Sequence, residues 1–154
     1  MKPLIVLLIA SVISLLSSRF ITGELNYTLA GNVAMAVMLV FTAYGHFLYV
    51  DGLAMMVPEI LPAKKLLVYT VGIVEVFFAA GLCLPSLRRL TADLLVLFFL
   101  LILPANIHAS NKSIDYETAT YQGRGPSYLW IRIPMQIFFI AWAAYFGIIM
   151  DQGE

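Results

Sequence analysis

Charged residues divide the chain into five apolar stretches separated by short polar or proline-containing links. Each stretch is close to the roughly 20 residues that a helix needs to cross a bilayer. No link is long enough to form a separate soluble domain, so we expect a single all-α membrane domain over residues 1–154. The predicted spans cover residues 3–19, 29–50, 66–84, 91–109 and 128–150.

The first stretch has two interpretations. Lys2 followed by an apolar run is typical of a signal peptide. Ser11, Ser14 and Ser18, however, fall at three- and four-residue spacing, which gives a helix one small packing face. No small-x-small cleavage motif follows them. We therefore expect a membrane helix.

The link over residues 51–65 is too apolar for a solvated loop, and its Pro58 and Pro62 would break a long helix. It predicts a short amphipathic turn, or a lid folded over one end of the bundle. The link over residues 84–91 predicts a tight turn through Pro85. Its two arginines, Arg88 and Arg89, are then expected outside the membrane.

Composition supports a membrane protein and excludes some classes of function. Hydrophobic residues make up 62% of the chain and charged residues 12%, against about 45–50% and about 25% in soluble domains. Nine basic residues balance nine acidic ones without a basic run, which excludes a nucleic-acid partner. A single cysteine, Cys83, provides no internal disulfide or CxxC pair, which argues against a self-contained thiol oxidase.

The distribution of cations predicts the orientation in the cell membrane. With five spans, the two termini lie on opposite faces. One face has five cations and the other has three, and the richer face is expected in the cytoplasm together with the N-terminus. The five are Lys2, Lys64, Lys65, Lys112 and Arg124, and the three are Arg19, Arg88 and Arg89.

Glu75 lies in the middle of an otherwise uncharged stretch, residues 66–87. A carboxylate at bilayer depth costs roughly 2.5 kcal/mol or more, so a polar partner is expected. At about 1.5 Å of rise per residue, His46, Asn106 and Arg132 lie roughly 6 Å inside one face. Glu75 and Gln136 lie at roughly 12–14 Å from the same face. Four helices thus direct polar groups to one half of the bilayer, which predicts a polar pocket open to that face.

Arg132 and Gln136 are four residues apart and share a helix face, where Pro134 weakens the hydrogen-bond ladder. The long arginine side chain can bridge the difference in depth, so we predict an ion pair between Glu75 and Arg132. His46 can join them, because its charge changes near neutral pH.

Each of these residues also has a structural interpretation. The pair of Glu75 with Arg132 could only fix the bundle, and Arg132 could instead extend to lipid headgroups. His46 could belong to an aromatic interfacial belt. Asn106 could satisfy backbone carbonyls that Pro104 leaves free.

A series of motifs in a set order resembles the DoxX-like membrane proteins, of DoxX/MauE type, over about residues 32–145. The motifs are Gly45-His46-Phe47, Met56-Val57-Pro58 with Leu61-Pro62, Gly72-x-x-Glu75, Pro85 with Arg88, Pro104-Ala105-Asn106-Ile107 and Arg132-x-Pro134-x-Gln136.

The resemblance implies a four-helix core formed by the second to fifth spans, with the first span as an addition. DoxX-like proteins are associated with membrane redox systems, including quinol oxidase and thiosulfate:quinone oxidoreductase subunits. The receptor-assembly chaperone NACHO is more distantly similar. The resemblance implies that His46, Glu75, Asn106, Arg132 and Gln136 carry any shared property. The cysteine pair of thiol-handling relatives is missing here.

The leading functional hypothesis is a pocket for a lipophilic small molecule, a quinone or a lipid, in an accessory component of a membrane redox system. Histidine and a buried carboxylate suit proton exchange with a reduced quinone. Tyr44 and His108 are secondary candidates. No metal site is expected, and no stand-alone enzymatic activity.

The alternative is a non-enzymatic assembly factor whose polar cluster is structural, with another membrane protein or a second copy of the chain as partner. A haem between His46 and His108 fits the sequence less well. Ion transport has little support from one carboxylate without an inverted repeat.

Overall fold

The computed structural model describes residues 2–150, which are almost entirely helical. The elements, in order, are α1 (Lys2–Thr22), α2 (Tyr27–Leu48), α3 (Val50–Met56), α4 (Lys64–Cys83), α5 (Pro85–Asn111), a 3₁₀ turn η1 (Gly125–Tyr128), α6 (Leu129–Ala144) and a π-helical turn η2 (Tyr145–Ile149). Strand-like pairing within these residues is limited to a bridge between Asp115 and Thr120. The expectation of an all-α chain is confirmed.

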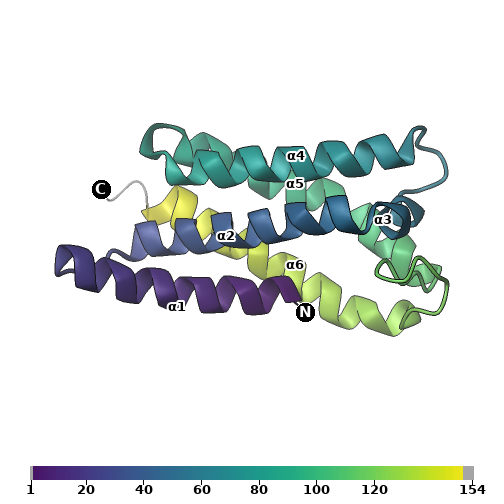
Figure 1. The fold of residues 1–154 in the computed structure, drawn as a ribbon, viewed down its shortest axis with the longest axis horizontal. Helices are drawn as coiled ribbons and strands as arrows, with labels where there is room; N and C mark the ends of the chain where they lie inside the picture. The colour runs from purple at the N-terminus through teal and green to yellow at the C-terminus, as the bar shows by residue number, and fades with distance from the viewer. Residues whose placement is uncertain (1, 151–154) are drawn as a thin grey trace.

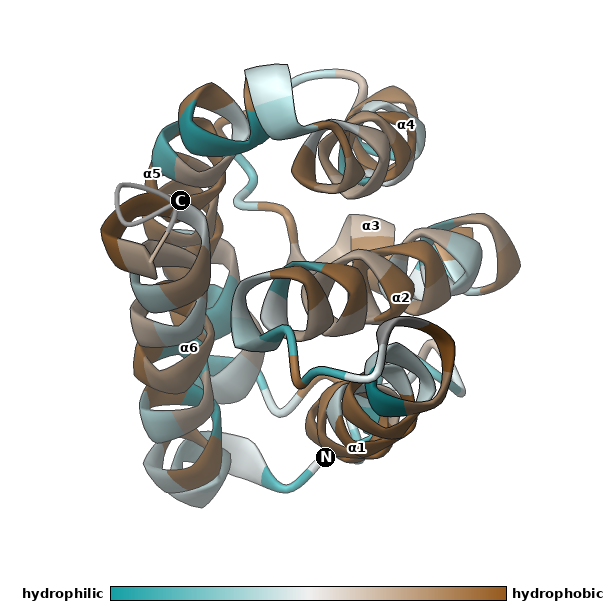
Figure 2. Cartoon of the chain, turned by 90° about the vertical axis from the view of Figure 1, so that its left-hand side faces the viewer, coloured by the Kyte–Doolittle hydropathy of each residue, from teal (hydrophilic) through white to brown (hydrophobic). Residues whose placement is uncertain are grey.

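Within residues 2–150, five helices are long and apolar enough to cross a membrane: α1, α2, α4, α5, and α6 with its flanking turns. They run along the long axis of the molecule (Figure 1). Much of their ribbon has the colour of hydrophobic residues (Figure 2), and many of their large apolar side chains are exposed. This is the surface expected of a multi-pass membrane protein, whose lipid-facing side chains are apolar.

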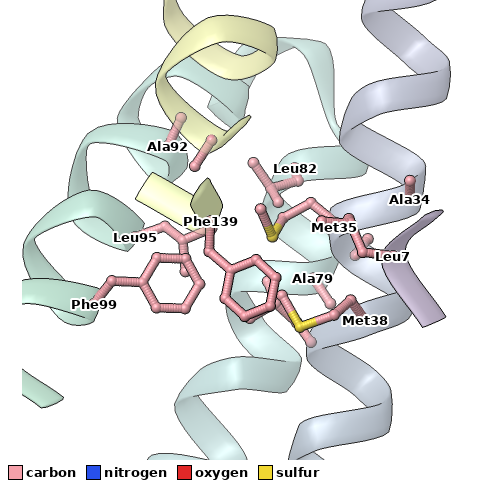
Figure 3. Close-up of a cluster of buried hydrophobic side chains, with 13 residues drawn as sticks. Leu7, Ala34, Met35, Met38, Ala79, Leu82, Ala92, Leu95, Phe99 and Phe139 are labelled. Carbon is pink, nitrogen blue, oxygen red and sulfur yellow. The ribbon is translucent and has the colours of Figure 1, made fainter. Parts of the chain in front are cut away.

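α2 is the central helix, with α1 and α4 packed against it and α5 packed on α4 and α6 (Figures 1 and 2). The core contains Met35, Met38, Leu82 and Leu95, each almost fully buried (Figure 3). Leu7 of α1 is fully buried in the same core. Side chains from every membrane-length helix therefore share one apolar core.

α6 crosses α2 at a steep inclination (Figures 1 and 2). Near its C-terminal end it is close, because Trp142 Nε1 donates to the carbonyl oxygen of Gly31 at 3.0 Å. Gly31 permits this approach, since a Cβ there would lie 2.2 Å from Phe146 Cγ. Towards Leu129 the two helices diverge (Figure 1), and the cavity described below lies between them.

The start of the fourth span differs from the sequence expectation. Residues 84–91 were expected to form a tight turn, but α5 already begins at Pro85. Proline is well suited to the first helical position, where its missing N–H leaves no hydrogen bond unmade. Arg88 is buried at this end of the bundle, where its Nε donates to the carbonyl oxygen of Leu82. Its position outside the membrane stays a prediction.

One end of the bundle is covered as the apolar 51–65 link predicted. α3 buries Gly52, Ala54 and Met56 at this end, and the chain leaves the helix before Pro58. The backbone of residue 116 approaches α3 so closely that a Cβ at Gly52 would lie 1.9 Å from the Tyr116 carbonyl oxygen. The α3 helix and the 112–124 loop therefore form a joint cover.

Candidate functional site: a polar cavity between diverging helices

A cavity of about 420 Å³ lies between α2 and α6, beneath the cover formed by α3 and the 112–124 loop. Its lining includes all five residues predicted to form the pocket, His46, Glu75, Asn106, Arg132 and Gln136, together with the secondary candidate Tyr44. Apolar side chains complete the walls, among them Met38, Phe99, Ile102, Met135 and Phe139. The predicted residues thus share one space, with their polar groups divided between two walls.

The first polar wall joins α2 and α4. Glu75 is buried at 4% exposure, and its Oε2 lies 3.1 Å from His46 Nδ1. The same nitrogen lies 2.9 Å from the carbonyl oxygen of Thr42 and is aligned with it. Among residues 2–150, no well-aligned hydrogen-bond donor reaches Glu75 Oε2. His46 and Glu75 are therefore close enough to form an ion pair, but the carboxylate can still accept a further hydrogen bond.

The second polar wall joins α5 and α6. An Arg132 terminal nitrogen donates to Asn106 Oδ1 at 2.8 Å. Gln136 Nε2 donates to the carbonyl oxygen of Phe99 at 2.7 Å, in the turn that precedes Pro104. The contact between the Asn106 and Gln136 amides is long, at 3.5 Å. Two interhelical hydrogen bonds thus hold α5 against α6 on this wall.

The predicted ion pair between Glu75 and Arg132 is not formed within residues 2–150. α4 packs against α2, which brings Glu75 to His46. The Arg132 guanidinium instead lies over the ring of Tyr128, 4.8 Å from its centroid, and 5.8 Å from the Tyr116 centroid. Cation–π contact and the Asn106 amide stabilise the arginine without a carboxylate.

The entrance of the cavity includes residues that the sequence did not indicate. Lys2 Nζ donates to Glu117 Oε1 at 2.7 Å, which links the start of α1 to the 112–124 loop. Burial raises the pKa of Tyr116 to about 12, and its hydroxyl donates to Glu117 at 3.2 Å. Tyr128 precedes Arg132 by one helical turn, so the sequence spacing could have indicated that the two side chains lie together. Lys2 and Glu117 are too far apart in the sequence for any spacing to indicate their contact.

His108 lies elsewhere. It lines a second cavity, of about 470 Å³, with Glu59, Lys112 and Tyr121. This cavity is on the outer side of α3, and an ion pair between Lys112 and Glu59 lies along it. His46 and His108 thus face different spaces, so an axial haem pair between them has no geometric basis. Residues 2–150 contain no group of three histidine, cysteine or carboxylate side chains that could hold a metal ion.

A family model described as a domain of unknown function, DUF8561, matches residues 35–147. The chain belongs to the DUF8561 family. The matched segment runs from α2 to η2 and contains His46, Glu75, Asn106, Arg132 and Gln136, whereas α1 precedes it. No curated protein and no solved structure matches the chain.

Proposed function

We propose that this protein binds the polar end of a lipophilic small molecule, a quinone or a lipid, in the cavity between α2 and α6. The observation that supports this most is the lining of the cavity, where five polar side chains from four helices meet within apolar walls. A volume of about 420 Å³ lies within the usual range of small-molecule sites, about 300–1,000 Å³.

The exposure of the rim supports a ligand that reaches the cavity from the lipid. Phe41, Tyr44 and Leu48 line the cavity and are also exposed on the surface of α2. A long apolar chain could pass between them while the polar end stays inside. Water-soluble ligands would gain nothing from such a rim, because it faces hydrocarbon in a membrane.

The direct test is extraction of the protein purified in a mild detergent, followed by mass spectrometry of the organic phase. We expect a quinone or lipid in near-stoichiometric amount. Gly45→Leu is the matched control, because Gly45 lines the cavity and a Cβ there meets nothing within 4 Å. The variant should fold and lose the ligand. A wild-type protein that is consistently empty, and that quinones and lipids fail to stabilise, would contradict the proposal.

The order of sequence motifs supports a relationship to DoxX-like proteins and, through it, an accessory role in a membrane redox system. In this proposal α2, α4, α5 and α6 are the DoxX-like four-helix unit and α1 is an addition. The N-terminus and the cavity entrance then face the cytoplasm. Co-purification with a quinone-dependent membrane complex from the native host would support the role, and its absence under crosslinking would argue against it.

An assembly-factor role is the second candidate, and the hydrogen bond from Gln136 to Phe99 favours it. That bond satisfies a polar side chain inside the bundle without any ligand, as a structural network requires. In this case Glu75→Gln would reduce the recovery of a partner membrane protein, and no small molecule would be extracted. Extraction of a ligand from the wild type distinguishes the two candidates.

A further inference from the structure

Glu75 presents unused acceptor capacity to the cavity. A carboxylate has about four lone-pair sites. The donor nearest to Glu75 Oε2 is His46 Nδ1, whose single N–H is aligned with the Thr42 carbonyl oxygen. Glu75 is also only 4% exposed, so contact with bulk water replaces little of the missing donor. A ligand with an O–H or N–H group would complete this site.

On the other polar wall, the Arg132 guanidinium has N–H donors that lack acceptors among residues 2–150. A guanidinium has five N–H donors, and among residues 2–150 its hydrogen-bond acceptor is Asn106 Oδ1. The faces of Tyr128 and Tyr116 stabilise the positive charge without accepting its other N–H groups. A ligand with an oxygen acceptor would complete this wall. The cavity thus offers an acceptor on one wall and donors on the other.

We propose that the cavity selects an amphiphile whose polar end donates a hydrogen bond to Glu75 and accepts one from Arg132. This rests on the proposed function and names the class of ligand for the same site. A hydroquinone has this chemistry, since each hydroxyl both donates and accepts. A phospholipid with a primary ammonium and a phosphate has it too. An oxidised quinone has acceptors only, so its carbonyl would face the lone pairs of Glu75.

We expect the site to bind a hydroquinone more tightly than its quinone, because the quinone cannot donate a hydrogen bond to Glu75. A hydrogen bond to a charged group is worth about 1.5–3 kcal/mol, which is about 10- to 150-fold in affinity. The apolar contacts with Met38, Phe99 and Phe139 are the same for a quinone and its hydroquinone. The ratio of the two affinities therefore reports on the polar groups rather than on the apolar walls.

The experiment measures equilibrium binding to the full chain in detergent, under anaerobic reducing conditions for the reduced probe. The probes are a short-chain benzoquinone, its hydroquinone and the dimethyl ether of that hydroquinone, which lacks a donor. A second pair, phosphatidylethanolamine and phosphatidylcholine, differs in the same property, because only the first has N–H groups on its headgroup. A tenfold or greater preference for the probe with an O–H or N–H donor, within either pair, supports the proposal. The pair that shows the preference identifies the ligand as a hydroquinone or as a phospholipid.

Glu75→Gln tests whether the carboxylate causes this preference, and Asp93→Asn, at an exposed position of α5, is the matched control. Glu75→Gln should bring the affinity ratio close to one, and Asp93→Asn should leave it unchanged. The wild-type ratios remain informative even if Glu75→Gln fails to fold. Equal wild-type binding of both members of each pair, or a preference for the quinone, overturns this inference and leaves the proposed function intact. Absence of binding by every probe, with no ligand extracted, overturns the proposed function itself.

Discussion

Glu75 Oε2 lies 3.1 Å from His46 Nδ1, and that nitrogen lies 2.9 Å from the carbonyl oxygen of Thr42. The single N–H of that nitrogen is aligned with the Thr42 carbonyl oxygen, so the carboxylate lies beside the imidazole without a well-aligned hydrogen bond from it. The contact joins α2 to α4 at a point where a carboxylate would otherwise lie unpaired inside a membrane-length helix. It is a buried charge contact in which Glu75 Oε2 keeps unused capacity to accept a hydrogen bond.

The first prediction concerns the coupling of these two side chains. In a double-mutant cycle with His46→Gln and Glu75→Gln, we expect a favourable coupling of about 0.6 kcal/mol and at most about 1.7 kcal/mol, the average and the maximum for interhelical hydrogen bonds in a membrane protein. Unfolding in mixed micelles of increasing denaturing detergent gives the four free energies. Asp93→Asn combined with His46→Gln is the control and should be additive. A coupling within error of zero would mean that the two groups do not interact.

The second prediction concerns the bond from Gln136 to Phe99. Gln136 Nε2 donates to the Phe99 carbonyl oxygen at 2.7 Å in a buried position. Gln136→Leu keeps the bulk of the side chain but leaves that carbonyl with one partner fewer, so we expect a loss of about 1 kcal/mol in the free energy of unfolding. Ile137→Leu, at the exposed neighbouring position, should be neutral. Equal stability of the two variants would contradict this role.

The length and composition of the apolar stretches predicted the membrane-length helices well, because both are local properties of the sequence. The common level of the five polar side chains was also predictable, because position along a helix depends on the rise per residue, and all five line one cavity. The partner of Glu75 was not predictable in the same way. It depends on α4 lying against α2, and helix adjacency is a property of the whole bundle.

The entrance residues illustrate the same limit. Lys2 and Glu117 meet across the cavity mouth, but they belong to α1 and to the 112–124 loop. Neither residue carries a motif, and long-range pairs of surface charges are common without function. The predicted start of the fourth span was wrong for a local reason. A proline that follows one helix can also occupy the first position of the next helix, as Pro85 does in α5.

The third prediction uses two glycines near the cover of the cavity. A Cβ at Gly52 would lie 1.9 Å from the Tyr116 backbone oxygen, whereas a Cβ at Gly45 meets nothing within 4 Å. Gly52→Ala must therefore displace the loop, and we expect a loss of about 1–3 kcal/mol in stability. Gly45→Ala should be neutral or gain up to about 1 kcal/mol from helix propensity. Thermal unfolding of both variants checks this, and similar shifts in melting temperature would contradict the close approach.

The fourth prediction concerns pH and the cavity entrance. The hydrogen bond from Lys2 holds the pKa of Glu117 below its ordinary value of 4.5. A lowered pKa in the folded state stabilises the protein above the unfolded pKa, and this stabilisation is lost as pH falls through the folded value. The difference in melting temperature between wild type and Glu117→Gln should be constant well above pH 4.5, decrease as pH falls below 4.5, and vanish once pH is below the lowered pKa of the folded state. Because the pair is exposed, the difference should be small and decrease with salt. A difference independent of pH would show that the ion pair does not contribute.

The fifth prediction tests the orientation that the cations indicate, through the single cysteine of the chain. Cys83 is exposed at the end of α4, and α5 separates this end from the 112–124 loop. With the N-terminus in the cytoplasm, the C-terminal end of α4 faces outwards, so a membrane-impermeant maleimide should label Cys83 in intact cells. Thr118→Cys in a Cys83→Ser background places the thiol on the opposite face and should react only after permeabilisation. The reverse pattern would place the N-terminus and the cavity entrance outside, where the cavity would open to a different pool of ligands.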